Sequence, residues 1–304
     1  PMADFGVHGF PADLNPSDPL ERYREVLEVL PPQFSTVWIS DHMQFGHEAT
    51  VEGWTTLTYL AALFPRYTYG HLVLSQSYRN PALLAKMAAT LQLFSGGRYI
   101  LGMGAGWHEE EYRSFGFEYP RSGVRVAQLG EAIEIMRTMW TTTPATFHGE
   151  HYSIDDAFCV PRPDPRIPIL VGTNGPKALA IAARLADMWC WDGPLDDTYL
   201  RPLEILRGHC KAIGRPFDEI TLTSELTIEL PDDPSKFEPT FTHPFYGDAV
   251  VFRLLGPRPT DVIQDIERLV DVGVRHLILN FNDMTTFTRF LADVVPHVRL
   301  ETRK

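Results

Sequence analysis

The chain has 304 residues, of which 44% are hydrophobic and 22% are charged, and its formal net charge is −12. This length can bury a large core, either as two ordinary domains or as one α/β barrel. The acidic balance argues against a nucleic-acid partner, and no apolar run reaches the roughly 18 residues that a membrane span needs.

The ends of the chain and its cysteines indicate the compartment. The N-terminus lacks the basic and then apolar regions of a secretory signal. Cys159, Cys190 and Cys210 are odd in number and far apart, which fits a reducing cytoplasm better than a disulfide framework. We therefore expect a cytoplasmic protein.

Strand-like and helix-like segments alternate along the chain. Strands are expected at 5–9, 36–39, 70–75, 99–103, 167–171, 188–191, 220–228 and 276–281. Helices are expected at 18–29, 81–94 and 129–140, from residue 176, and from 261 to a terminal glycine at 273.

Eight strands that alternate with helices predict an α/β fold, a (β/α)8 TIM barrel. No first-strand G-x-G-x-x-G motif supports a doubly wound sheet instead. We expect a single domain over 1–304, with insertions near 141–166 and 231–245 over the C-terminal face. The first insertion is expected to contain a short hairpin at 147–152.

The stretch YILGMGAGWHEEEY, at 99–112, joins a strand to an acidic helix start through three glycines. Glycines at the carboxyl end of a strand let a ligand approach the main chain, and α/β enzymes place their active sites there. Glu109 and Glu110 are interpreted as first-turn carboxylates that complement the helix dipole.

The expected strand ends carry a set of polar residues. His42 can exchange a proton near neutral pH, and the adjacent Asp41 can hold its tautomer. A purely structural histidine is the alternative, which the position at the rim disfavours. Ser75 either bonds a ligand or caps the next helix, and Arg79 either contacts an anion or forms an ion pair.

The loop Gly172-Thr173-Asn174-Gly175 precedes an expected helix start, whose free N–H groups suit a phosphate. The alternative is a tight turn without a ligand. Trp107 and Trp191 either wall a planar ligand or plug the barrel. The histidines show no metal-ligand spacing, and no nucleophile elbow is present. A phosphorylated planar redox cofactor fits these features best.

Several motifs together resemble one family. They are Ser40-Asp41-His42-Met43, Ser77-Tyr78-Arg79-Asn80-Pro81, Ser95-Gly96-Gly97-Arg98, the stretch from Gly104 to Tyr112, the loop from Gly172 to Pro176, and Gly273-Val274. The chain resembles the luciferase-like monooxygenase superfamily of flavin and deazaflavin TIM-barrel enzymes. It is most similar to the branch that uses coenzyme F420, a hydride-carrying deazaflavin.

The resemblance implies a cis peptide bond between Leu72 and Val73 that presses on the deazaflavin ring, and it places His42 near the hydride-accepting carbon. The cofactor-binding residues that it implies are Asp41, Leu72, Val73, Ser75, Gly106, Trp107, His108, Gly172, Thr173, Asn174 and Gly175. Trp107 and Trp191 are expected to contact substrate. Family members that act on sugar phosphates carry a glutamate at the position of Trp107, so the indole favours a less polar substrate.

The expected activity is hydride transfer between F420 and a small organic substrate, with His42 as proton donor or acceptor and no metal. An FMN-dependent monooxygenase and a non-catalytic cofactor-binding protein remain alternatives. The resemblance also suggests a homodimer. Because the tail of F420 is acidic, it would need a local basic track, for which Arg79, Lys86, Arg98 and Lys177 are the candidates.

Overall fold

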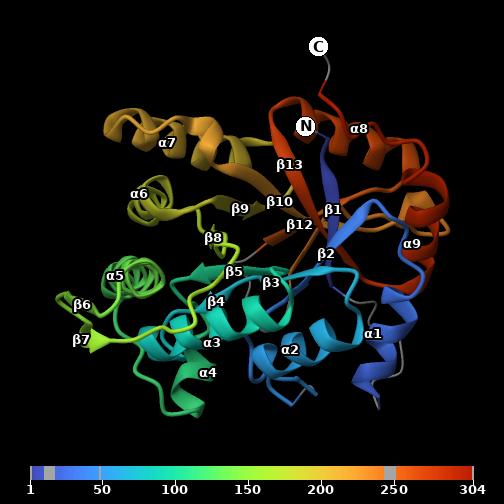
Figure 1. Cartoon of the computed structure of the whole chain (residues 1–304). Helices are drawn as coiled ribbons and strands as arrows, with labels where there is room; N and C mark the ends of the chain where they lie inside the picture. Colours follow the sequence, from blue (N-terminus) through green and yellow to red (C-terminus); the bar gives the residue numbers. More distant parts are fainter. Residues whose placement is uncertain (1, 10–17, 48, 243–250, 303–304) are drawn as a thin grey trace.

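Eight parallel strands form a closed barrel at the centre of the molecule (Figure 1). The structure is a computed structural model, and it describes residues 2–9, 18–47, 49–242 and 251–302. The barrel strands are β1 (Asp4–Gly9), β2 (Phe34–Ile39), β3 (Thr68–His71), β5 (Tyr99–Gly104), β8 (Ile169–Gly172), β9 (Met188–Asp192), β10 (Thr221–Ile228) and β13 (Val274–Phe281). The two-residue β4 (Leu74–Ser75) pairs with β5.

The pairing order closes the sheet on itself. Neighbouring strands pair in parallel from β1 through β2, β3, β5, β8, β9, β10 and β13, and β13 pairs again with β1. Seven of the predicted strands lie within two residues of the expected ends, and the third, expected at 70–75, is divided into β3 and β4. The predicted α/β class and the TIM-barrel architecture are therefore confirmed.

Helices surround the barrel (Figure 1). They are α1 (Pro19–Leu27), α2 (Gly53–Leu63), α3 (Pro81–Phe94), α4 (Glu109–Ser114), α5 (Ser122–Thr141), α6 (Pro176–Leu185), α7 (Asp197–Ile213), α8 (Pro259–Asp271) and α9 (Met284–Arg289). Among the described residues, no helix is both long enough and apolar enough to cross a membrane.

Two long helices, α2 and α7, were not expected from the sequence. Helix α2 begins at a glycine, and its N-cap is the Glu52 side chain, which accepts hydrogen bonds from the amides of Trp54 and Thr55. Helix α7 contains Pro202, a residue that normally ends a helix. Gly53 at the start of α2 and Pro202 inside α7 both disfavour a helix locally. Tertiary packing overrides this preference, since each helix buries one face against the barrel.

The two insertions take different positions. The first forms the predicted hairpin, β6 (Ala145–His148) with β7 (Ser153–Ala157), beside α5 (Figure 1). It reaches the C-terminal rim through the Tyr152 hydroxyl, which donates to Gln76 at 2.8 Å. The second follows β10 and forms β11 (Thr240–Thr242), which pairs with β12 (Val251–Leu255). Its expected end at 243–245 lies outside the described residues.

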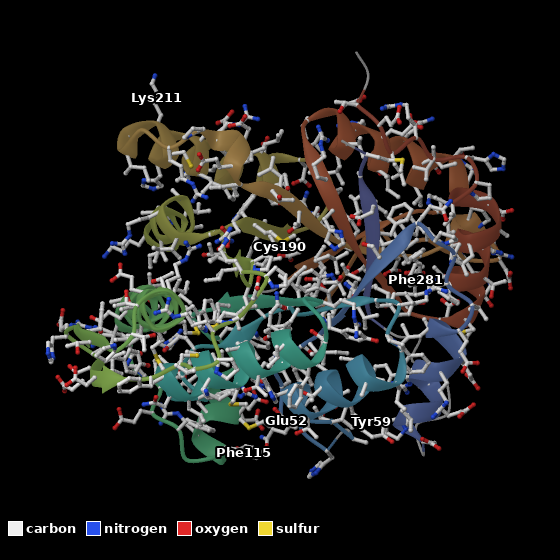
Figure 2. All side chains as sticks on the ribbon, in the orientation of Figure 1. Glu52, Tyr59, Phe115, Cys190, Lys211 and Phe281 are labelled. Atoms are coloured by element: carbon white, nitrogen blue, oxygen red, sulfur yellow. The ribbon has the colours of Figure 1, made fainter. Side chains whose placement is uncertain are left out.

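The middle of the barrel is filled by apolar side chains. They are Trp38, Leu72, Ile100, Leu170, Cys190 and Ile278. Figure 2 shows Cys190 near the centre of the molecule, whereas Tyr59 and Phe115 lie at its edge. This layer closes the barrel from below, so polar groups at the carboxyl ends of the strands lie above an apolar floor.

Candidate active site at the carboxyl ends of the barrel strands

The third barrel strand is interrupted where the family resemblance predicts it. The peptide bond between Leu72 and Val73 is cis and separates β3 from β4, so this prediction is confirmed. The Val73 side chain lies between Gly104 and Gly172. A Cβ atom at Gly104 would approach its Cγ2 to 2.6 Å, and one at Gly172 would approach its Cγ1 to 3.0 Å. The two glycines thus make room for the interrupted segment.

Asp41 forms a buried ion pair with Arg79 rather than a contact with His42. The Arg79 guanidinium donates two hydrogen bonds to the carboxylate, each 2.9 Å long, and the Ser75 amide donates a third at 3.0 Å. Arg79 also contacts Glu52 at 2.7 Å. Arg79 was expected either to contact an anion or to form an ion pair, and the structure shows the ion pair. Asp41 connects β2, β4 and α2 at one corner of the site.

The carboxylate that holds His42 is Glu111, in the first turn of α4. Nδ1 of His42 lies 3.1 Å from Oε2 of Glu111, and the Tyr78 hydroxyl donates to the same oxygen at 2.6 Å. The other oxygen accepts from the amides of Met43 and Gln44. The expectation that Asp41 fixes the tautomer of His42 is therefore wrong, because Arg79 and the Ser75 amide bind the Asp41 carboxylate.

Glu111 is fully buried and ionised. Burial alone would raise its pKa, but the hydrogen bonds from His42, Tyr78 and the Met43 amide lower the pKa to about 2. A buried carboxylate with this many donors is a fixed acceptor. Because the Glu111 carboxylate can only accept, Nδ1 of His42 is the donating nitrogen, and Nε2 is free to exchange a proton. Among the described residues, no group bonds this Nε2.

Aromatic rings surround His42. Its ring centroid lies 4.5 Å from that of Phe45 and 5.4 Å from that of Trp107. His108 stacks with the same two residues, with interplanar angles of 20° to Phe45 and 18° to Trp107. Trp107 is 41% exposed, so the indole forms an outer edge of the site instead of plugging the barrel.

Ser75 is buried and hydrogen-bonded to the Tyr112 hydroxyl. Gly106 allows this contact, because a Cβ atom there would lie 1.8 Å from the tyrosine oxygen, and the residue has a φ of 78°. Gly106 is thus required by the packing of Tyr112 within the loop. Trp191, the second predicted aromatic wall, is half-buried and packs against the core.

The Gly172–Gly175 loop leads into α6, whose N-terminus has no side-chain cap and no acidic residue in its first turn. The Thr173 amide donates to the carbonyl of Cys190 at 3.3 Å. Within the described part of the chain, the amides of Asn174, Gly175 and Lys177 have no protein acceptor. These N–H groups and the helix dipole favour an anion.

The expected basic track is not formed. Arg79 is paired with carboxylates, Lys86 donates to the carbonyl of Val160, and Arg98 donates to the carbonyls of Tyr67 and Ala61. These three cations have structural roles, and Lys177 lies exposed at the start of α6.

A second polar group, which the sequence reading missed, lies at the ends of β1, β9, β10 and β13. Glu225 accepts hydrogen bonds from His8 and from Asn280, each 2.7 Å long. Asp192 faces Glu225 across the strand pair. Burial and the neighbouring Glu225 raise the pKa of Asp192 to about 6. These residues come from four strands, so only the closed barrel brings them together.

The site therefore has a buried acid–base network on one side, an acidic group on the other, and an uncapped helix N-terminus beside them. A closed barrel with such groups at the carboxyl ends of its strands is the arrangement of a (β/α)8 enzyme. The family model for luciferase-like monooxygenases matches residues 33–271, and the chain belongs to this family. The family predicted from the sequence motifs is confirmed.

Relatives and solved structures agree with this assignment. The chain is 32% identical over 301 residues to the F420-dependent glucose-6-phosphate dehydrogenase of Kineococcus radiotolerans, covering 87% of this chain and 88% of that protein. An F420-dependent secondary alcohol dehydrogenase in complex with an F420–acetone adduct has the same fold, with a TM-score of 0.78, 20% identity and full coverage of both chains. A long-chain alkane monooxygenase also shares the fold, with a TM-score of 0.76, 14% identity, and coverage of 100% of this chain and 94% of that one.

Proposed function

We propose that this protein is an F420-dependent oxidoreductase that transfers a hydride between the coenzyme and a small organic substrate. The curated relatives of this chain named above support the coenzyme. The observation that carries the proposal is the geometry of His42, whose Nδ1 bonds the buried Glu111 while its Nε2 has no partner among the described residues. F420 supplies the hydride chemistry when it is bound.

The described residues fit such a coenzyme. Val73, held between Gly104 and Gly172, provides an apolar support for a planar ring. The unpaired amides at the start of α6 provide donors for a phosphate without competition from a side-chain cap. The other helix start at the rim, that of α4, carries three glutamates and is unsuited to an anion.

His42 has the role of proton donor or acceptor in this proposal. Hydride transfer to or from a carbonyl or alcohol carbon requires a proton at the oxygen, and an imidazole can supply or remove it near neutral pH. Glu111 holds the ring in one orientation and one tautomer. Phe45 and Trp107 limit the access of water to it.

The substrate that suits this site is uncharged or cationic. The family resemblance favours a less polar substrate, because it places Trp107 where members that act on sugar phosphates carry a glutamate. Asp192 and Glu225, at neighbouring strand ends, would also repel a phosphate group. We therefore propose that the substrate differs from the glucose 6-phosphate of the named relatives. An alcohol, a carbonyl compound or an amine fits the polar groups better.

Replacing His42 with alanine is expected to lower the rate at saturating substrate by roughly 10²–10⁴-fold. The dissociation constant of F420 should change by less than about threefold, since the ring makes its contribution in the transition state. The measurement is the absorbance of F420 during turnover with a panel of alcohols and carbonyl compounds. His148, exposed on the hairpin, gives the matched control His148→Ala, which should keep the full rate. An undiminished rate in His42→Ala would remove His42 from the mechanism.

FMN with oxygen remains the alternative cofactor, and the alkane monooxygenase that shares the fold is the reason to keep it. A protein that binds the coenzyme without turnover is the second alternative, and it would show no rate that depends on His42. The expected single domain, homodimer, cytoplasmic location and absence of a nucleic-acid partner stay predictions.

A further inference from the structure

We propose that His42, His108 and Glu111 form a binding site for a divalent transition-metal ion such as Zn²⁺. One ligand atom of each residue lies within 4.8 Å of the other two. Two imidazoles and one carboxylate are the ligand set of zinc sites that keep a fourth position open. His42 lies in the loop after β2, whereas His108 and Glu111 lie at the start of α4, so the three residues show no metal pattern in the sequence.

The distances suit a tetrahedral ion. Oε2 of Glu111 lies 3.1 Å from Nδ1 of His42 and 3.8 Å from Nδ1 of His108. Ligand bonds of about 2.0–2.1 Å at tetrahedral angles separate the ligand atoms by about 3.4 Å. The two observed separations lie on either side of this value, and all three ligand atoms lie within 4.8 Å of one another, so the imidazole rings would turn inward to close around an ion.

His108 gives an independent indication of a ligand. The side chain is 6% exposed, and its Nδ1 is buried without any hydrogen-bond partner. A buried polar atom without a partner is unfavourable, because it has lost its hydrogen bonds to water. The orphan nitrogen is the one on the side of Glu111, where an ion would supply the missing partner.

The surroundings already hold the ligands in place. The Tyr78 hydroxyl and the amides of Met43 and Gln44 fix the carboxylate of Glu111, and such outer contacts orient metal ligands. Phe45 and Trp107 both stack on the His108 ring. The formal charge of the ligand set is −1, so a divalent ion leaves a net charge of +1.

This site shares His42 with the proposed reaction. An ion on Nδ1 replaces the donated hydrogen bond to Glu111 and draws the ring away from its catalytic orientation. The inference that metal binding inhibits turnover rests on the proposed function, but metal binding itself does not. The ion is thus expected to be an inhibitor and not a cofactor.

The test is a titration of the chelator-treated full-length protein with Co²⁺, followed by visible absorption, without F420 or substrate. The expected result is one Co²⁺ per chain with the intense bands of a tetrahedral site, displaced by Zn²⁺. His108→Ala should weaken binding by at least about tenfold, and Glu111→Gln should do the same. His148→Ala, which removes an exposed histidine on the hairpin, should bind as the unaltered protein does.

Two results would overturn the proposal. One is the absence of stoichiometric Co²⁺ binding, and the other is equal binding by a folded His108→Ala variant, with folding checked by circular dichroism. A protein that binds Co²⁺ but not F420 would refute the proposed function and leave the metal site intact. A protein that binds F420 but not Co²⁺ would refute the metal site and leave the proposed function intact.

Discussion

Glu111→Gln is expected to lower the turnover number by roughly 10²–10⁴-fold, the range seen when a histidine loses the carboxylate that orients it. In the structure, Glu111 accepts hydrogen bonds from His42, Tyr78 and two backbone amides. Glutamine keeps the shape but replaces one accepting oxygen with a donating NH₂ group. That group would face a donor, so the His42 ring would turn or change its tautomer.

The kinetic pattern separates this positioning role from a loss of structure. We expect the Michaelis constant and the dissociation constant of F420 to change by less than about threefold, because Glu111 is bonded to protein groups and acts through His42. Glu109→Gln is the matched control. Glu109 lies two residues away, half exposed, and pairs with Arg113 on the surface, so its replacement should leave the rate unchanged. Equal rates in Glu111→Gln and Glu109→Gln would contradict the assigned role.

Asp41→Asn is expected to reduce the free energy of unfolding by about 3 kcal/mol. The Asp41 carboxylate is 2% exposed and receives both ends of the Arg79 guanidinium and the Ser75 amide. The variant leaves the Arg79 charge partly buried with only Glu52 to pair with it. Removing one partner of a buried pair is costly, because the remaining charge has lost its compensation.

Urea denaturation of the two proteins measures this loss. Asp155→Asn is the control, since Asp155 is 75% exposed in its pair with His148 and its replacement should change the free energy of unfolding by less than about 0.5 kcal/mol. A loss below about 1 kcal/mol in Asp41→Asn would mean that the ion pair is not the buried connection described above.

The barrel could be predicted because its strands are buried runs of apolar residues separated by amphipathic helices. Pro81–Phe94 shows this most clearly, since its N-cap asparagine, its first-turn proline and its apolar face agree with one another. The start of α2 could not be predicted from such local sequence features. Its Gly53 is required by tertiary contact, because a Cβ atom there would lie 2.2 Å from the carbonyl oxygen of Ser40.

The site was predicted in part. The motifs located the loops, but they did not tell which acidic side chain points inward. Asp41 is adjacent to His42 in sequence and turns to Arg79, whereas Glu111 is distant in sequence and reaches His42. One signal was available: His108 and Glu111 are three residues apart and therefore share one face of the helix start. The group around Glu225 had no such signal, because its members come from different strands.

The most direct test of this account is a titration of the purified apoprotein with F420 and, separately, with FMN, followed by fluorescence. We expect saturable binding of one F420 per chain, tighter than that of FMN by at least about tenfold, or about 1.4 kcal/mol. Tight binding of FMN with weak binding of F420 would contradict the choice of coenzyme. Binding of neither would mean that no planar redox coenzyme occupies the mouth of this barrel.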